Sequence, residues 1–173
     1  VQPVILPIFQ QRASGLSEAM IKSRPATPFG SAWVGGVNII PGPDGVVRDF
    51  PASTMINGQV QPSMAVLISE DGSLGDRTFI PDWSIDVRKI PRLSFIDVVE
   101  GRVPVKAIAG KKIIVGATAI ELGDRYPIPR FGTVPGVVIQ ALAADSLIQN
   151  RALKRSGTAA TLLGLLLIGL LVA

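Results

Sequence analysis

The sequence predicts an α/β fold, a mixed sheet flanked by helices and followed by a transmembrane helix. Three observations support this. Residues 111–119 (KKIIVGATA) form a near-continuous apolar run, which is typical of a strand buried on both faces. Small and apolar residues recur with helical spacing after Pro135, and residues 158–173 (TAATLLGLLLIGLLVA) contain no charged side chain. We expect an extracytoplasmic domain at 1–155 and the start of a transmembrane helix at 156–173.

The C-terminal apolar run is short for a complete membrane span. At ~1.5 Å of rise per residue it reaches about 24 Å, whereas the hydrocarbon core of a bilayer is ~30 Å thick. We therefore expect the span to continue beyond the end of this sequence. A buried helix of a soluble core, which commonly has about 10 to 14 apolar residues, is the alternative.

Composition excludes several classes of chemistry. Charged residues make up 17% of the chain, below the usual share of about 25%, which fits a protein partly in lipid. The chain contains no cysteine and no histidine, which removes disulfides, thiolate nucleophiles, Cys/His zinc sites and Ser-His-Asp triads. The net charge is +4, but the basic residues are scattered, so we expect no nucleic-acid partner. No cofactor is expected.

The N-terminal half carries short strand and turn signals. Asp44-Gly45 favours a tight turn, because glycine accepts positive φ and aspartate tolerates it. Pro62 stands at a plausible first helical position, and Gly72 lies near the end of the same helix. We expect a strand at 4–9 interrupted by Pro7, a weakly helical surface segment at 16–22, a hairpin of 37–40 with 46–50, and a short buried helix at 62–69.

The second half predicts the core. Short strands are expected at 80–83 and 85–90, and a short helix at 93–100, with Ser94 as its N-cap, Asp97 in a variant capping box and Gly101 as its stop. The run 111–119 is the best candidate for a central strand. The helix after Pro135 is expected to pack one small-residue face on the sheet, formed by Val137, Ala141, Ala144 and Ile148. We expect it to continue through 150–157 as a helix with a soft joint at Ser156-Gly157.

Five segments in this order resemble the C-terminal part of the type-two CHASE domain, a cyclase/histidine-kinase-associated sensory extracellular domain. They are GPDGVVR, PSMAVLI, LSFIDVVEG, GKKIIVGATA with LGDRYPIP, and PGVVIQALAADSLIQNRALKR running into the apolar span. The resemblance covers residues 1–155, and its specificity lies in the order and spacing of the segments. The upstream half of the family, with its first transmembrane helix, is not in this sequence.

The resemblance implies an extracytoplasmic sensor in the bacterial inner membrane. Such a sensor precedes several transmembrane helices and a cytoplasmic output module, namely a nucleotide cyclase, a diguanylate cyclase or a protein kinase. The sequence departs from the family in the last helix, where an acidic residue and a histidine are common and Val138 and Gln140 stand instead. If those positions contribute to a ligand site, the site of this member differs.

Candidate ligand-binding residues follow the predicted central strand. Gly116, Ala117 and Thr118 come where a strand leads into a turn, and backbone amides at such a point hold anions or small ligands. Asp124 and Arg125 lie in the following loop, facing a ligand or holding the loop by hydrogen bonds. For Gly116 and Thr118 the simpler interpretation is a tight turn that needs small residues, since neither dinucleotide-binding nor P-loop spacing is present.

Other polar residues have mainly structural interpretations. Asp82 beside Trp83 is a further candidate ligand contact, although such a tryptophan more often covers the edge of a core. Asp97 and Glu100 fit a solvated helix face better than general acid–base catalysis. Asp44 serves its turn, and Arg48 is expected to be solvated or paired. We expect no catalytic residue and no metal site.

A basic cluster, Arg151, Lys154 and Arg155, directly precedes the apolar run. Counted alone, it would place this side of the membrane in the cytoplasm, against the resemblance. Orientation is set over all loops, and long domains translocate largely regardless of charge, so the extracytoplasmic interpretation is preferred. The cluster also suits contact with anionic lipid headgroups.

Three functional hypotheses follow from the sequence. The first is a sensor that binds a small-molecule or protein ligand of unknown identity, with the membrane as its second partner. The alternative from another class is a membrane-anchored α/β enzyme acting on a small anionic substrate. A module that only dimerises the receptor, without a ligand, is compatible with the same observations, so a homodimer is included among the expected partners.

Overall fold

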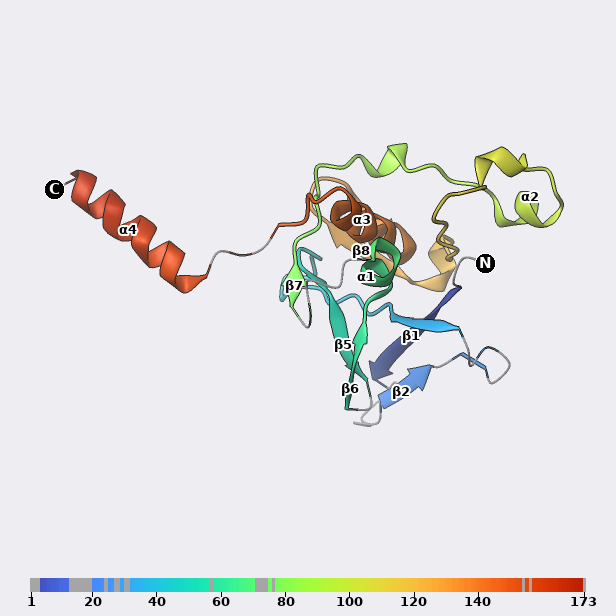
Figure 1. Cartoon of the computed structure of the whole chain (residues 1–173), viewed down its shortest axis with the longest axis horizontal. Coiled ribbons are helices and arrows are strands. Elements are labelled where there is room, and N and C mark those ends of the chain that lie inside the picture. Colours follow the sequence, from blue (N-terminus) through green and yellow to red (C-terminus); the bar gives the residue numbers. More distant parts are fainter. Residues whose placement is uncertain are drawn as a thin grey trace.

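The computed structural model describes residues 4–12, 20–23, 25–26, 29, 32–56, 58–70, 75, 77–153, 155 and 157–172. It has a mixed α/β body, built from several small sheets and helices, with one helix set apart from it (Figure 1). The predicted α/β class is therefore confirmed. The single mixed sheet that we expected is divided into one three-stranded sheet and three two-stranded sheets among the described residues.

The three-stranded sheet has the order β2-β1-β3, formed by β1 (Ile5–Arg12), β2 (Met20–Ser23) and β3 (Trp33–Gly36). β1 pairs with β3 in parallel and with β2 antiparallel. The predicted strand at 4–9 is confirmed and continues to Arg12. The helical expectation at 16–22 is wrong for Met20 to Lys22, which lie in β2, while 16–19 fall outside the described residues.

Three further pairs of strands are all antiparallel. β4 (Phe50–Pro51) pairs with β7 (Thr78–Phe79), and β5 (Ser53–Ile56) pairs with β6 (Gln59–Pro62). β8 (Arg125–Ile128) and β9 (Gly132–Pro135) form a hairpin that leads directly into the longest helix of the body. Two of these pairs, β5–β6 and β8–β9, join strands that are adjacent in sequence, whereas β4–β7 joins segments about 28 residues apart.

The predicted hairpin around Asp44-Gly45 is only partly correct. The turn exists, with Gly45 at φ 77° and its N–H bonded to the Gly42 carbonyl at 2.9 Å. Neither flank is a strand of that hairpin, because each bonds elsewhere. The Val37 N–H donates to the Ile8 carbonyl at 3.0 Å, and the Val47 N–H donates to the Pro127 carbonyl at 2.9 Å.

Helix α1 (Met64–Ser69) confirms the short buried helix, with a different start. The side chain of Ser63 caps it by accepting a hydrogen bond from the Val66 N–H at 3.3 Å, while Pro62 ends β6 instead of opening the helix. The helix ends at Glu70, whose φ is 61°, and Gly72 lies outside the described residues.

Helix α3 (Gly136–Ile148) is the centre of the core. The helix itself is confirmed, but the predicted packing face is only partly correct, since Ala144 is buried, Val137 and Ala141 are half-buried and Ile148 is exposed. Its most deeply buried side chains are Ile139, Leu142 and Ala143, whereas Ile148 is 48% exposed. The helix is covered on more than one side by α1, β9 and the loop segments. Its buried surface is therefore wider than the single face of residues spaced three and four apart that we expected. Phe50 and Phe79 pack in the same core with ring centroids 5.5 Å apart.

The expected strands at 80–83 and 85–90 are wrong. Ile80 forms only an isolated bridge with Leu153, and Val87–Lys89 is a 3-10 helix whose N-cap is Asp86. The helix expected at 93–100 is confirmed as α2 (Phe95–Val99). Ser94 occupies its N-cap position without a side-chain capping hydrogen bond, and Gly101 follows at φ 70°.

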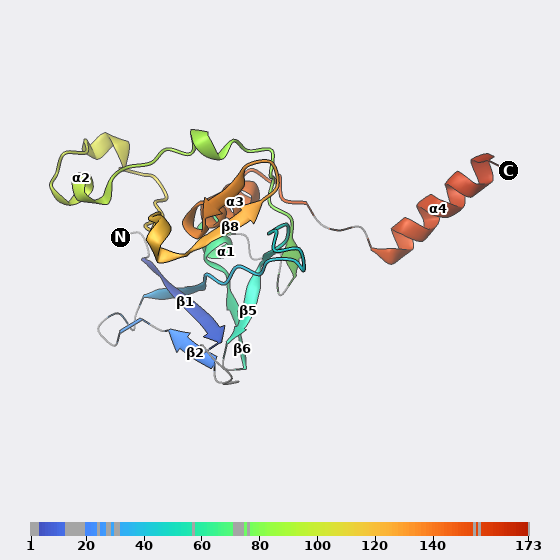
Figure 2. The same ribbon diagram turned by 180° about the vertical axis from the view of Figure 1, so that it is seen from behind.

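The predicted central strand at 111–119 is also wrong. This segment forms no strand and lies on the outside of the body, with Ile113 and Val115 exposed. A Cβ built on Gly116 would lie 2.5 Å from Val137 Cγ2, so the segment passes directly over the start of α3. Figure 2 shows the preceding arm, with α2, projecting from the side of the body opposite to α4. An apolar strand pattern does not specify which partner strands are within reach.

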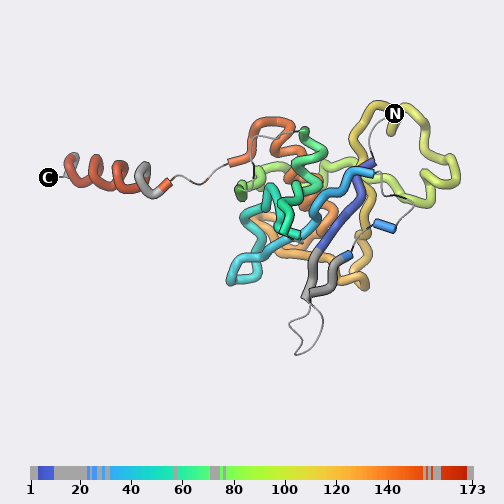
Figure 3. The backbone as a smooth tube through the Cα atoms, turned by 60° about the horizontal axis from the view of Figure 1, so that its bottom comes forward, coloured from blue at the N-terminus to red at the C-terminus, as the bar shows by residue number. Residues whose placement is uncertain are grey.

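Helix α4 (Thr158–Val172) is separated from the body by a connector (Figure 3). The expectation of a continuous helix through 150–157 is wrong, because the described residues of the connector are not helical. Within the described part of the chain, no helix has both the length and the hydropathy needed to cross a membrane.

Two alanine substitutions test which face of α3 is packed in the core. We expect Leu142→Ala to lower the free energy of unfolding by about 2–5 kcal/mol, because it opens a cavity beside Ile139 and Ala143. Ile148→Ala is the matched control and should cost less than about 1 kcal/mol, since its side chain is half exposed. Urea denaturation measures both values. A larger loss for the Ile148 variant would restore the packing face expected from the sequence.

Candidate functional site

The candidate residues lie at the two ends of α3. Gly116, Asp124 and Arg125 lie near its first residue, Gly136, whereas Asp82 contacts its last turn through Ser146. Thirteen residues of helix, about 20 Å at ~1.5 Å each, lie between the two places. The structure therefore divides the predicted site into two clusters, which we call the amino-end cluster and the carboxyl-end cluster.

The amino-end cluster is built around Asp124. The Gly136 N–H donates to the Asp124 main-chain carbonyl at 2.9 Å. A Cβ on Gly136 would lie 2.5 Å and 2.6 Å from the two carboxylate oxygens of Asp124, so a larger residue here would displace the Asp124 side chain from the start of the helix. A carboxylate at the start of a helix is favourable, because it faces the positive end of the helix dipole. The pKa of Tyr126 is raised, first by its burial and then by the nearby Asp124 charge.

The other two candidates at this end are more peripheral. Arg125 begins β8, and its guanidinium donates to the Thr133 carbonyl of β9 at 3.0 Å. It thereby fastens the hairpin that leads into α3. Thr118 is exposed and lies two residues after Gly116, the residue that packs against Val137 at the start of α3.

The carboxyl-end cluster joins Asp82 to the end of α3. The Asp82 N–H donates to Ser146 Oγ at 2.8 Å, and that buried hydroxyl donates to the Leu142 carbonyl at 2.7 Å. One carboxylate oxygen of Asp82 accepts from the Ser84 N–H at 2.8 Å, and the other forms an ion pair with Arg151. The pKa of Asp82 is lowered, mainly by the hydrogen bonds from Ser84 and further by the Arg151 charge.

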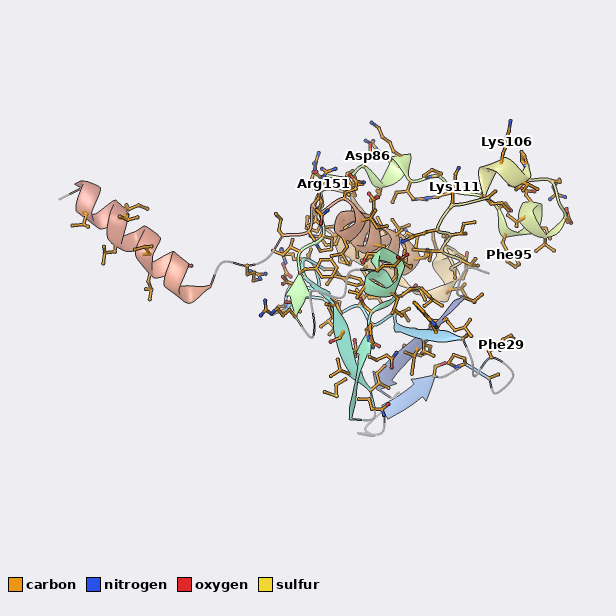
Figure 4. All side chains as sticks on the ribbon, in the orientation of Figure 1. Phe29, Asp86, Phe95, Lys106, Lys111 and Arg151 are labelled. Atoms are coloured by element: carbon orange, nitrogen blue, oxygen red, sulfur yellow. The ribbon has the colours of Figure 1, made fainter. Side chains whose placement is uncertain are left out.

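The same cluster continues along the connector toward α4. Ile80 and Leu153 exchange two backbone hydrogen bonds of 2.8 Å and 2.9 Å. The Arg155 guanidinium then donates to both carboxylate oxygens of Asp49, at 3.1 Å and 2.8 Å. Figure 4 places Arg151 on the side of the body from which the chain leaves toward α4. We call these contacts the connector clamp: Asp49 with Arg155, Ile80 with Leu153, and Asp82 with Arg151.

The connector clamp was not predictable from the sequence. The sequence places Arg151 and Arg155 in a basic cluster before the apolar run that suits contact with anionic lipid headgroups, and it gives no signal at Asp49. The partners Asp49 and Arg155 are 106 residues apart. Lys154, the third member of the basic cluster, lies outside the described residues.

Gln140 occupies one of the two positions at which this sequence departs from the expected family pattern. Its side chain is only 4% exposed, and Nε2 donates to the Val37 carbonyl at 3.1 Å. Among the described residues, Oε1 has no hydrogen-bond partner. Gln140 therefore links α3 to the chain just after β3, a position where a polar side chain is costly unless it is bonded.

Several other carboxylates form exposed ion pairs. Asp97 and Glu100 both pair with Arg102, and Asp44 pairs with Arg48 at 2.8 Å. The interaction with Arg48 and the hydrogen bond from the Val46 N–H lower the pKa of Asp44 to about 2. No group of three acidic side chains suited to a metal ion occurs among the described residues. Such surface pairs serve local structure and add little stability.

Comparison with known proteins identifies one family. The family model of the CHASE2 domain matches residues 4–173. No curated protein and no solved structure shows a significant match to this chain.

Neutralising Asp82 should loosen the connector. We expect Asp82→Asn to raise hydrogen–deuterium exchange at the Leu153 amide, because the variant loses the Arg151 ion pair beside the Ile80 bridge. Asp86→Asn is the control, since Asp86 pairs with Arg88 within its own 3-10 turn. In the wild type, Asp82 contributes fully to the stability of the folded state above its ordinary pKa of 3.8. Because its folded pKa is lowered, this contribution is lost as the pH falls from 3.8 through the folded pKa. Equal exchange in both variants would show that Asp82 does not hold the connector.

Proposed function

Because the chain belongs to the CHASE2 domain family, we propose that it is the extracytoplasmic sensor module of a membrane-bound bacterial signalling receptor. CHASE2 domains are sensory extracellular domains of signalling receptors, and the family match over residues 4–173 is the observation that carries the proposal. In this proposal the signal passes through transmembrane helices to a cytoplasmic nucleotide cyclase, diguanylate cyclase or protein kinase. The sensory body comprises 1–155, and 156–173 begins the first of those helices.

The composition of α4 supports insertion into the bacterial inner membrane. Its 15 residues include no charge, and its leucine and isoleucine side chains are exposed along its described length. Such a surface is stable in hydrocarbon and unfavourable in water. The helix stands clear of the body, so its apolar side chains have no place in the core (Figure 1).

The connector clamp supports the extracytoplasmic orientation of the body. Arg151 and Arg155, which would otherwise favour the cytoplasmic side, are paired with Asp82 and Asp49 of the domain. Their positive charge is thereby partly balanced within the protein. The basic cluster is therefore a weaker argument against the extracytoplasmic orientation that the family implies.

The same clamp supplies a route for the signal. The connector between α3 and α4 is held by two ion pairs and a backbone bridge to segments from distant parts of the chain. A ligand that shifted the segments carrying Asp49 or Asp82 would move or release the connector, and with it α4. Candidate ligand contacts are the residues of the amino-end cluster, Gly116, Thr118, Asp124 and Arg125, while Asp82 acts in the clamp. The ligand itself, a small molecule or a protein, is not specified by these groups.

The proposed location is tested by proteolysis of cells that express the intact receptor. Protease added to spheroplasts should digest the body, because it lies outside the inner membrane, and the protein should sediment with membranes. A cytoplasmic protein in the same cells serves as the lysis control. Digestion only after lysis would reverse the orientation.

The proposed route is tested by charge reversal in the clamp. We expect Asp49→Arg to change the resting output of the intact receptor by about 1.4- to 5-fold, the range given by an exposed ion pair. The exchange Asp49→Arg with Arg155→Asp restores the pair and should return the output toward the wild-type level. Asp44→Arg is the control, because Asp44 pairs only within its own turn. Output that is unchanged in Asp49→Arg would exclude this route.

A further inference from the structure

The three-stranded sheet β2-β1-β3 is attached to the rest of the body through few buried side chains. Of the side chains described in this sheet, Ile8 is the one apolar group that is fully buried, and Trp33 is 52% exposed. Ile8 does not belong to the core cluster that surrounds α3. Helix α1 lies between the sheet and α3 (Figure 1, and from behind in Figure 2). A segment with so few buried apolar contacts opens more readily than the core does.

Two glycines form the contact of the sheet with α1. A Cβ built on Gly35 would lie 2.9 Å from Met64 Cα, so the backbones of β3 and α1 approach closely here. Gly36 forms an isolated parallel bridge with Ser63, the N-cap of α1. Both glycines are buried, but neither has a side chain that interlocks with the helix. Opening of this contact therefore exposes little apolar side-chain surface from the sheet.

A buried amide adds a direct link from the sheet to α3. Gln140 Nε2 donates to the Val37 carbonyl at 3.1 Å, and the Val37 N–H donates to the Ile8 carbonyl of β1 at 3.0 Å. In the described part of the chain, Gln140 Oε1 has no hydrogen-bond partner, so this buried amide is only half satisfied. An apolar side chain of similar size would avoid the cost of the unpaired oxygen. What glutamine adds at this position is the link to Val37.

We propose that β1, β2, β3 and Val37 form a flap that opens from the α1–α3 core as one unit, with the hydrogen bond between Gln140 and Val37 as its latch. Opening of the flap breaks this hydrogen bond and gives solvent access to Met64, which lies beside Gly35. A ligand or partner that binds only one of the two states shifts their populations. The inference stands apart from the proposed sensory function, because flap opening is measured on the purified chain without any signalling output.

Native-state hydrogen exchange of the full 173-residue chain in detergent tests the flap. In the wild type, the hydrogen-bonded amides of the sheet and of Val37 should exchange through one shared opening. This opening should be more frequent than that of the α3 amides of Leu142 and Ala143. Sheet amides that exchange only together with those of α3 would show a single cooperative unit and overturn the proposal.

Two substitutions in α3 separate the latch from the core. Gln140→Met removes the bond to Val37 and keeps a side chain of similar size. It should speed exchange in the flap by about 2- to 13-fold, the range given by the net contribution of one hydrogen bond, while exchange in α3 stays the same or slows.

Leu142→Ala is the matched control, because it opens a cavity in the core and leaves the latch in place. It should speed exchange in α3 and leave the flap nearly unchanged, since the flap exchanges by its own local opening. If Gln140→Met leaves exchange in the flap unaltered, or speeds α3 by the same factor, Gln140 is a packing residue and the latch is excluded.

A reversible disulfide between the flap and the body gives an independent measurement. A Cβ built on Gly36 would lie 3.8 Å from the Cβ of Thr54 in β5, which is within the range for a disulfide, and the chain contains no native cysteine. In the Gly36→Cys, Thr54→Cys chain, oxidation should slow exchange in all three strands of the flap, and reduction should restore it. The reduced chain is the control. Equal exchange of β1 and β2 in the two forms would show that these strands open from β3 singly, and would rule out a flap.

Discussion

Burial of helix α3 is the constraint on which the rest of the structure depends. Its middle residues, from Val138 to Leu147, make up a large share of the core, together with Phe50 and Phe79. Two polar side chains within the helix are buried with it, Gln140 and Ser146, and each bonds a different part of the chain. The helix therefore orders the segment after β3 through Gln140 and the segment before η3 (Val87–Lys89) through Ser146. Loss of the helix would remove both attachments.

The two ends of this helix have different roles. At its start, Gly136 permits the close approach of Asp124, whose carboxylate lies at the positive end of the helix dipole. At its end, Ser146 and Asp82 lead to Arg151 and the connector. In the proposed mechanism, a change at the amino end would reach the connector through this buried helix. The arrangement fits a sensory domain, because the candidate ligand contacts and the connector clamp lie at the two ends of the same helix.

The connector clamp combines contacts of different strength. The ion pair of Arg155 with Asp49 is exposed, and exposed pairs contribute only about 0–1 kcal/mol each, whereas Arg151 pairs with the largely buried Asp82. The backbone bridge between Ile80 and Leu153 adds two hydrogen bonds. In the proposed mechanism, a modest binding energy would suffice to open a clamp of such contacts. A continuous helix, which we expected here, would have transmitted motion without such a release.

The sequence by itself determined the α/β class, the position of α1, α2 and α3, the turn at Asp44-Gly45, and membership of the sensory family. These features depend on local spacing, capping residues and the order of segments, all of which are visible along the chain. Only the tertiary structure decided which face of α3 is buried, that residues 111–119 lie outside, and that Asp49 and Asp82 hold the connector. The apolar pattern of 111–119 predicts that the segment is buried, but it does not identify the residues that would cover it. Ile148 and Leu142 are equally apolar, and their burial differs because of neighbours supplied from residues far away in sequence. The same holds for Arg155, whose partner is 106 residues distant, since an ion pair at that separation exists only after the chain has folded.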